Sequence, residues 1–105
     1  MIELLAKLLI AHAVCDYPLQ GDFLSKAKNP SAPISGVPWQ WAMASHAAIH
    51  AGAVWALTGS AWLALFEFVA HASIDYLKCV GVLTFSQDQW LHVICKVVWA
   101  VGGES

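Results

Sequence analysis

Proline and glycine residues divide this chain into four apolar segments, each long enough to form one helix. Helices are predicted at about 2–16, 39–57, 61–80 and 87–101, with one long loop at 17–38. Proline lacks the amide hydrogen that a helix needs, and glycine favours the left-handed backbone that ends one. The pattern therefore predicts an all-α protein with a single domain over residues 1–105.

The last predicted helix carries a capping signal at its start. Ser86 precedes the apolar segment, and Gln89 follows three residues later, which is the spacing of a capping box. We therefore expect Ser86 to be the N-cap of this helix.

Charged residues are scarce, at 11% of the chain, whereas soluble proteins carry about 25%. Segment 39–57 contains 19 residues without a formal charge, close to the roughly 20 that cross a bilayer core. These features predict a four-helix, up-down-up-down transmembrane bundle, with the lipid bilayer as a partner. Segments 2–16 and 87–101 would reach only about 23 Å, less than the roughly 30 Å of hydrocarbon. An apolar bundle outside the membrane is therefore the alternative.

The few charges and the cysteines argue against several classes of protein. Five lysines, no arginine and seven acidic residues give a net charge of -2, so no basic face is expected and nucleic acid is not an expected partner. Cys15, Cys79 and Cys95 form no CxxC pair and are interpreted as apolar fillers rather than zinc ligands. The sequence leaves homo-oligomer formation open.

Every histidine in the chain has a histidine or aspartate four residues away. Residues at this spacing lie on the same face of an α-helix, so each pair can present two donor atoms in one direction. The pairs, one in each predicted helix, are His12 with Asp16, His46 with His50, His71 with Asp75, and Asp88 with His92. A histidine that is only hydrogen-bonded to its helix neighbour is the simpler interpretation of any single pair.

The positions of the pairs along the helices favour a joint site. The pairs come late in the first and third segments and early in the second and fourth, and these ends meet in an up-down-up-down bundle. Imidazole and carboxylate donors without thiolate suit zinc, manganese, iron or nickel. We therefore expect these eight residues to bind one or two divalent metal ions.

Other polar residues lie close to the pairs in sequence. Gln20, Lys78 and Gln89 are candidates for binding a cofactor or substrate. Lys78 could instead extend to an interface, and Gln89 could only cap its helix. Glu67 lies one turn from His71 and could accept a hydrogen bond from it or face a neighbouring helix.

Three sequence motifs carry a resemblance to a known family. HAVCDYPLQGDF, HASIDYLK and DQWLH resemble signatures of domain-of-unknown-function family 3307, which comprises small membrane proteins of bacteria and their phages. The resemblance implies four membrane helices and no established activity. It also implies a location in a bacterial inner membrane, or in the host inner membrane if the protein is phage-encoded.

A metal-dependent hydrolase is the preferred function, acting on a phosphoester or amide substrate at the membrane face. Asp16, Asp75 and Asp88 are the candidate catalytic bases where they are not ligands. A lipid-linked precursor or a nucleotide would be a suitable substrate. The alternatives are a metal-ion or proton transporter or sensor, and a non-catalytic phage accessory protein that binds a host component.

Overall fold

The computed structural model describes residues 1–104, and its side chains through Gly103. This part of the chain contains five helices and no strand, which confirms the prediction of an all-α protein. The helices are α1 (Ile2–Asp16), α2 (Gly21–Ala27), α3 (Trp39–Thr58), α4 (Ala61–Cys79) and α5 (Phe85–Glu104). α2 was not expected from the sequence, because it lies inside the segment predicted to be a loop.

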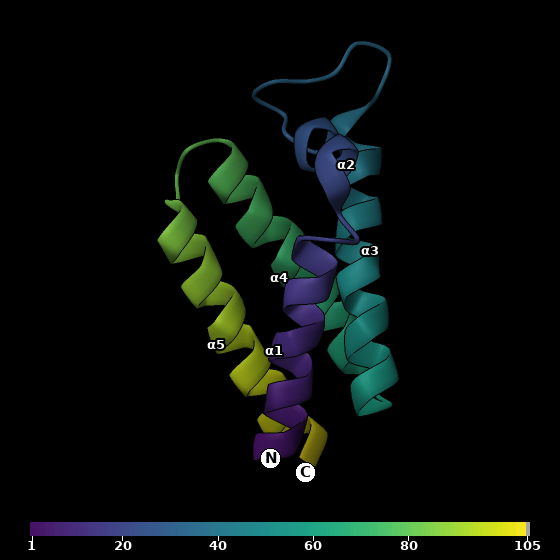
Figure 1. Ribbon diagram of the computed structural model, residues 1–105, viewed down its shortest axis with the longest axis vertical. Helices are drawn as coiled ribbons and strands as arrows, with labels where there is room; N and C mark the ends of the chain where they lie inside the picture. Colours follow the sequence, from purple (N-terminus) through teal and green to yellow (C-terminus); the bar gives the residue numbers. More distant parts are fainter. Residues whose placement is uncertain (105) are drawn as a thin grey trace.

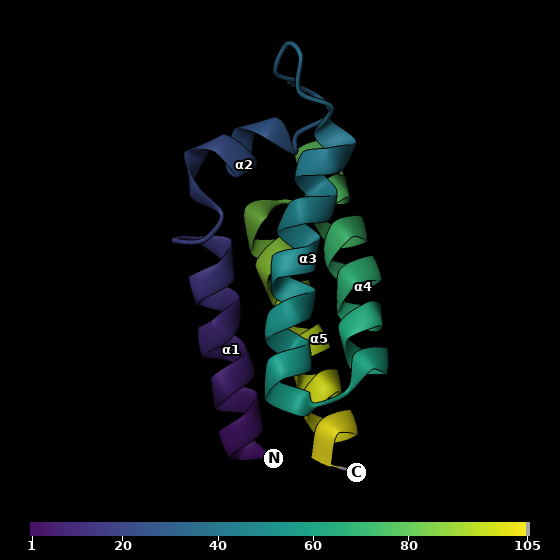
Figure 2. The same ribbon diagram turned by 90° about the vertical axis from the view of Figure 1, so that its right-hand side faces the viewer.

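The four long helices lie along the long axis of the molecule, and α2 lies across the end opposite the two chain termini (Figures 1 and 2). α3 packs most extensively against α4, while α1 contacts both α3 and α5. α5 also packs against α4, and α2 packs against α3. The interior is therefore lined by α1, α3, α4 and α5.

A tight turn joins α3 to α4. Gly59 ends α3 with a positive φ of 70°, and its N–H donates to the Trp55 carbonyl at 2.8 Å. Ser60 then caps α4, because its hydroxyl accepts a hydrogen bond from the Leu63 N–H at 3.2 Å. Two residues thus reverse the chain, which brings the polar faces of α3 and α4 together.

The capping box at the start of α5 differs from the predicted one. The Thr84 hydroxyl accepts from the Gln87 N–H at 3.1 Å, and the Gln87 side chain accepts from the Thr84 N–H at 2.9 Å. The prediction of Ser86 as N-cap is therefore wrong, because the helix begins two residues earlier than expected and Thr84 offers an equivalent hydroxyl. Gln89 is left free to point into the molecule.

The prediction of membrane-spanning helices is also wrong. Within residues 1–104, no helix is both long enough and apolar enough to cross a bilayer. α1 has only 15 residues, and the histidines and charged residues of α3, α4 and α5 lower the hydropathy of the longer helices. An inner-membrane location and the lipid bilayer as a partner remain predictions.

The interior has an apolar part and a polar part. Leu8, Val54, Trp99 and Ala100 form the apolar cluster, near the end that holds both chain termini. Beyond it, the described chain buries ten polar or charged side chains, as many as its buried apolar ones. Buried polar groups cost free energy unless they are paired, so the partners of these ten side chains decide whether the fold is stable.

We predict that Thr84→Ala lowers the free energy of unfolding by about 1 kcal/mol, because it removes the hydroxyl of the capping box. The matched control is Ser86→Ala, which alters a neighbouring exposed hydroxyl outside the box. Urea unfolding of both variants measures the difference. Equal losses of stability would contradict the assignment of the cap.

Candidate metal centre

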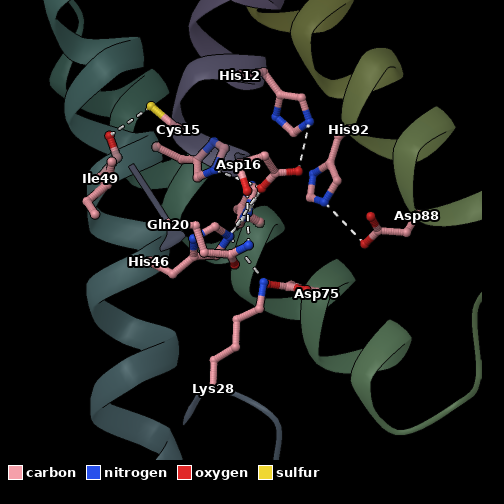
Figure 3. A network of polar contacts seen from close by, with 12 residues as sticks. His12, Cys15, Asp16, Gln20, Lys28, His46, Ile49, Asp75, Asp88 and His92 are labelled. Carbon is pink, nitrogen blue, oxygen red and sulfur yellow. Dashed lines mark hydrogen bonds and ion pairs between the residues drawn. The ribbon is translucent and has the colours of Figure 1, made fainter. Parts of the chain in front are cut away.

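The five histidines converge in the interior of the protein, and Figure 3 shows three of them, His12, His46 and His92, around Asp16. His12 comes from α1, His46 and His50 from α3, His71 from α4 and His92 from α5. The His71 ring is stacked between two others, with centroid distances of 3.7 Å to His50 and 4.2 Å to His92. All five side chains are buried, so their nitrogens must find partners inside the protein.

Asp16 joins three of these histidines in a compact group of donor atoms. Its Oδ1 lies 3.1 Å from His50 Nε2, 3.3 Å from His46 Nε2 and 3.8 Å from His71 Nε2. His46 Nε2 and His71 Nε2 are 3.0 Å apart. Four ligands at the usual zinc–nitrogen distance would be about 3.4 Å apart in a tetrahedron. The Asp16 group is therefore close to the dimensions that a divalent ion requires.

A second group shares one member with the first. His12, His71 and His92 can bring one nitrogen each within 4.8 Å of the others. His12 Nε2 also lies 3.4 Å from Asp16 Oδ2, so both carboxylate oxygens face histidine nitrogens. The two groups together could hold one ion or two adjacent ions. His71 belongs to both groups, but a neutral imidazole has one lone pair and would bind only one of two ions.

Hydrogen bonding alone does not satisfy this cluster. The facing Nε2 atoms of His46 and His71 can share only one hydrogen. Both ring nitrogens of His12 are buried without a hydrogen-bond partner, and so are the Nδ1 atoms of His46, His71 and His92. Such unpaired buried atoms are costly. A cation among the Nε2 atoms would give His12 Nε2 a partner and would resolve the competition of His46 Nε2 and His71 Nε2 for one hydrogen.

The protonation states also favour metal binding. Burial lowers the pKa of His12 to about 3 and holds the pKa values of His50 and His71 below their usual range. These rings are therefore neutral near pH 7 and keep a lone pair for a metal. Burial raises the pKa of Asp16, but hydrogen bonds with His46 and His50 outweigh this effect and lower it, so the carboxylate is ionised.

The structure places two of the predicted ligands outside both groups. Asp75 Oδ2 is 2.5 Å from Lys28 Nζ and 3.4 Å from His46 Nε2, and Asp75 Oδ1 is 3.3 Å from Lys78 Nζ. Asp75 therefore lies beside the cluster with its charge already balanced. Figure 3 shows the long Lys28 side chain reaching toward this carboxylate.

Asp88 is the other predicted ligand outside the groups. Its Oδ1 lies 3.3 Å from His92 Nε2, and its Oδ2 accepts a hydrogen bond from Gln89 Nε2 at 2.9 Å. Burial raises the pKa of Asp88, but hydrogen bonding with His92 and the nearby charge of Lys78 outweigh this effect and lower it. Asp88 is thus an ionised neighbour of the cluster.

The three residues predicted to bind a cofactor or substrate make different contacts with the cluster. Gln89 Nε2 lies 3.4 Å from Asp16 Oδ2, so this side chain bridges Asp16 and Asp88. Gln20 instead donates to the Asp16 backbone carbonyl at 2.9 Å. Lys78 is 30% exposed, and the charges of Asp75 and Asp88 raise its pKa despite its burial. Lys78 is therefore a protonated side chain with access to solvent.

Two buried lysines were missed by the sequence analysis. Lys28 follows α2 in a segment without helical periodicity, so no spacing rule connects it with Asp75. Lys96, by contrast, comes four residues after His92, and the same spacing that revealed the histidine pairs could have identified it. Lys96 forms a buried ion pair with Glu67.

The fold and the site define an all-α protein whose interior holds a histidine and aspartate cluster of metal-ligand dimensions. The chain belongs to the family described as "Protein of unknown function (DUF3307)", whose model matches residues 4–103. This match confirms the family predicted from the sequence. No curated protein and no solved structure matches the chain.

We predict that the metal-free protein loses stability as the pH falls from about 6.5 toward 3. Because burial lowers the pKa of His12 from 6.5 to about 3, the unfolded chain binds a proton in this range before the folded chain does. Each such histidine contributes a slope of about 1.4 kcal/mol per pH unit. Urea unfolding with a chelator present, at several pH values, measures the slope.

The matched variant for this measurement is His12→Asn, which removes one titrating ring and should reduce the slope. A free energy of unfolding that stays constant between pH 7 and pH 4 would contradict the neutral, buried state of the histidines.

Proposed function

We propose that this protein is a metal-dependent hydrolase in which Asp16, His46, His50 and His71 hold a divalent ion. The supporting observation is that their donor atoms come from three helices and all lie within 4.8 Å of one another, with the Asp16–histidine and His46–His71 separations at 3.0 to 3.8 Å. Zinc, manganese, iron and nickel suit these donors. The neighbouring His12 and His92 offer donor atoms for a second ion. The activity would be hydrolysis of a phosphoester or amide.

The proposed architecture is an up-down-up-down bundle of α1, α3, α4 and α5. In this arrangement the end of α1, the start of α3, the end of α4 and the start of α5 meet at one level. That topology explains how pairs from four helices reach one site. It also leaves the α2 segment free to cover the site with Lys28.

The charge balance of the site supports an anionic substrate. With neutral histidines, the buried core and its rim contain four carboxylates and three lysines, which leaves a net charge of -1. The carboxylates are Asp16, Asp75, Asp88 and Glu67, and the lysines are Lys28, Lys78 and Lys96. One divalent ion would change this charge to +1, which favours a negatively charged ligand such as a phosphoester. A nucleotide or a lipid-linked phosphate has this chemistry.

A divalent ion supplies a water molecule of lowered pKa and polarises a phosphoryl or carbonyl oxygen. The protein must supply the base. Asp16 belongs to the donor group and Asp75 is bound by Lys28 and Lys78, so Asp88 is the carboxylate available for proton transfer. Gln89 connects it to Asp16 and would hold it in place. Lys78 would contact the anionic part of the substrate.

Transport is less well supported than hydrolysis. A transport path needs polar groups along the whole bundle, but here the polar core ends at Glu67 and Lys96. One turn further along α5 lie Trp99 and Ala100, which pack in the apolar cluster with Leu8. The apolar cluster would interrupt a chain of ions or protons, although a metal sensor would be compatible with it.

A structural metal is the second candidate function, and the deep burial of the ligands favours it. His46 and His71 have no exposed surface, and Asp16 is the most exposed member of the group at 12%. In this case the ion would join the helices of a non-catalytic accessory protein that binds a host component.

The variants Asp88→Asn and His71→Ala distinguish a hydrolase from a protein with a structural metal. If the protein is a hydrolase, Asp88→Asn retains the metal but loses about 100-fold or more in turnover, because it lacks the base. His71→Ala loses both metal and activity. The measurements are elemental analysis and hydrolysis of p-nitrophenyl phosphate and a p-nitroanilide by the zinc-loaded and manganese-loaded protein.

Asp22→Asn is the matched control, since Asp22 lies exposed on α2. Full activity of Asp88→Asn would contradict the role of Asp88 as the base. A metal-loaded wild-type protein that hydrolyses neither substrate, together with an unfolded His71→Ala variant, would favour the structural metal.

A further inference from the structure

A buried ion pair adjoins the histidine cluster on the side of the apolar core. Glu67 on α4 and Lys96 on α5 form this pair, with relative exposures of 0% and 1%. Removing two charges from water is expensive, and apolar residues of the same size often stabilise a protein as well or better. The pair therefore calls for an explanation other than stability.

Two buried atoms, one in this ion pair and one next to it, have no hydrogen-bond partner. Lys96 binds Glu67 Oε1, which leaves Oε2 of the same carboxylate unpaired. His71 Nδ1, one helical turn further along α4, is also unpaired and lies 4.0 Å from Glu67 Oε1. The carboxylate that carries the unpaired acceptor thus lies close to a ring nitrogen that can be a donor.

The orientation of His71 decides which nitrogen carries the hydrogen. Its Nε2 faces His46 and Asp16, at 3.0 and 3.8 Å. An imidazole that binds a metal through Nε2 keeps its hydrogen on Nδ1, and that hydrogen needs an acceptor. Glu67 is the carboxylate on the Nδ1 side of the ring.

We propose that Glu67 is a positioning residue for His71, accepting the Nδ1–H hydrogen bond when Nε2 binds a metal ion. This inference rests on the proposed metal site. The 4.0 Å separation is measured to Oε1, which already binds Lys96. A rotation of the Glu67 carboxylate that brings the unpaired Oε2 to Nδ1, with Lys96 kept on Oε1, would form the hydrogen bond. Lys96 balances the charge of the carboxylate and limits its movement.

The same contact would influence both groups of donor atoms, because His71 belongs to each of them. Fixing one ring therefore fixes the geometry of the whole centre. Glu67 and Lys96 also link α4 to α5, so metal binding at His71 would tighten the contact between these helices.

Glu67→Gln tests the proposal, because the amide has the same size but lacks the charge. We expect zinc affinity to fall 10-fold to 100-fold, the usual effect of losing the partner of a metal-binding histidine. Competition with a chromophoric chelator measures the affinity. The matched control is Glu3→Gln. Glu3 is exposed and forms an ion pair with Lys7, four residues further along α1, which is the spacing of Glu67 and His71 on α4. This control should leave the zinc affinity unchanged.

A second variant and a second readout keep the test independent of folding. Glu67→Gln leaves Lys96 without a charged partner, so the double variant Glu67→Gln, Lys96→Met removes both buried charges and should fold while showing the same loss of affinity. In nitrogen-15 spectra of the zinc-loaded wild-type protein, we expect a protected Nδ1 hydrogen on His71. Both variants should weaken this protection, because a neutral amide oxygen is a weaker acceptor than a carboxylate.

A folded Glu67→Gln variant that binds zinc within twofold of the wild-type affinity would overturn the role of Glu67 and leave the metal site intact. Wild-type protein that binds no zinc would overturn the metal site and the positioning role together. The two failures are therefore distinguishable.

Discussion

The Asp16 carboxylate is the contact on which the rest of the interior depends. Its two oxygens face histidine nitrogens of α1 and α3, with a further histidine of α4 at 3.8 Å. An ionised carboxylate is stable inside a protein only with partners of this kind. The positions of three helices relative to one another are therefore set by polar contacts, whereas the apolar cluster of Leu8, Val54, Trp99 and Ala100 occupies only the end near the chain termini.

The buried polar side chains that hold the helices together are also the residues of the candidate metal centre. An ordinary core is filled by apolar side chains. Among the described residues of this protein, the largest fully buried side chains are almost all those of histidines, acids or lysines. Each buried lysine meets a carboxylate from another part of the chain: Lys28 reaches Asp75 from the α2 segment, and Lys96 reaches Glu67 from α5. A metal ion would add the partner that the facing nitrogens of His46 and His71 lack.

Helical spacing was enough to predict an all-α protein and to identify the histidines that meet, because residues four apart share one helix face. It could not show that Asp75 would be bound by Lys28, since that contact depends on the path of the chain after α2. It also could not choose between Ser86 and Thr84 as the cap, because both offer a hydroxyl followed three residues later by a glutamine. The error about the membrane has a physical cause too: polar residues inside the helices were interpreted as a site within a bilayer, but they also remove the hydropathy that crossing one requires.

The central claim is that Asp16, His46, His50 and His71 hold a divalent ion, and X-ray absorption at the zinc edge of the loaded protein tests it most directly. We expect one or two ions per chain, with nitrogen and oxygen ligands alone at about 2.0–2.1 Å and the outer scattering of imidazole rings. Sulfur scattering at about 2.3 Å would place the ion at cysteines instead. That result, or a folded protein that retains no zinc after gel filtration, would contradict the claim.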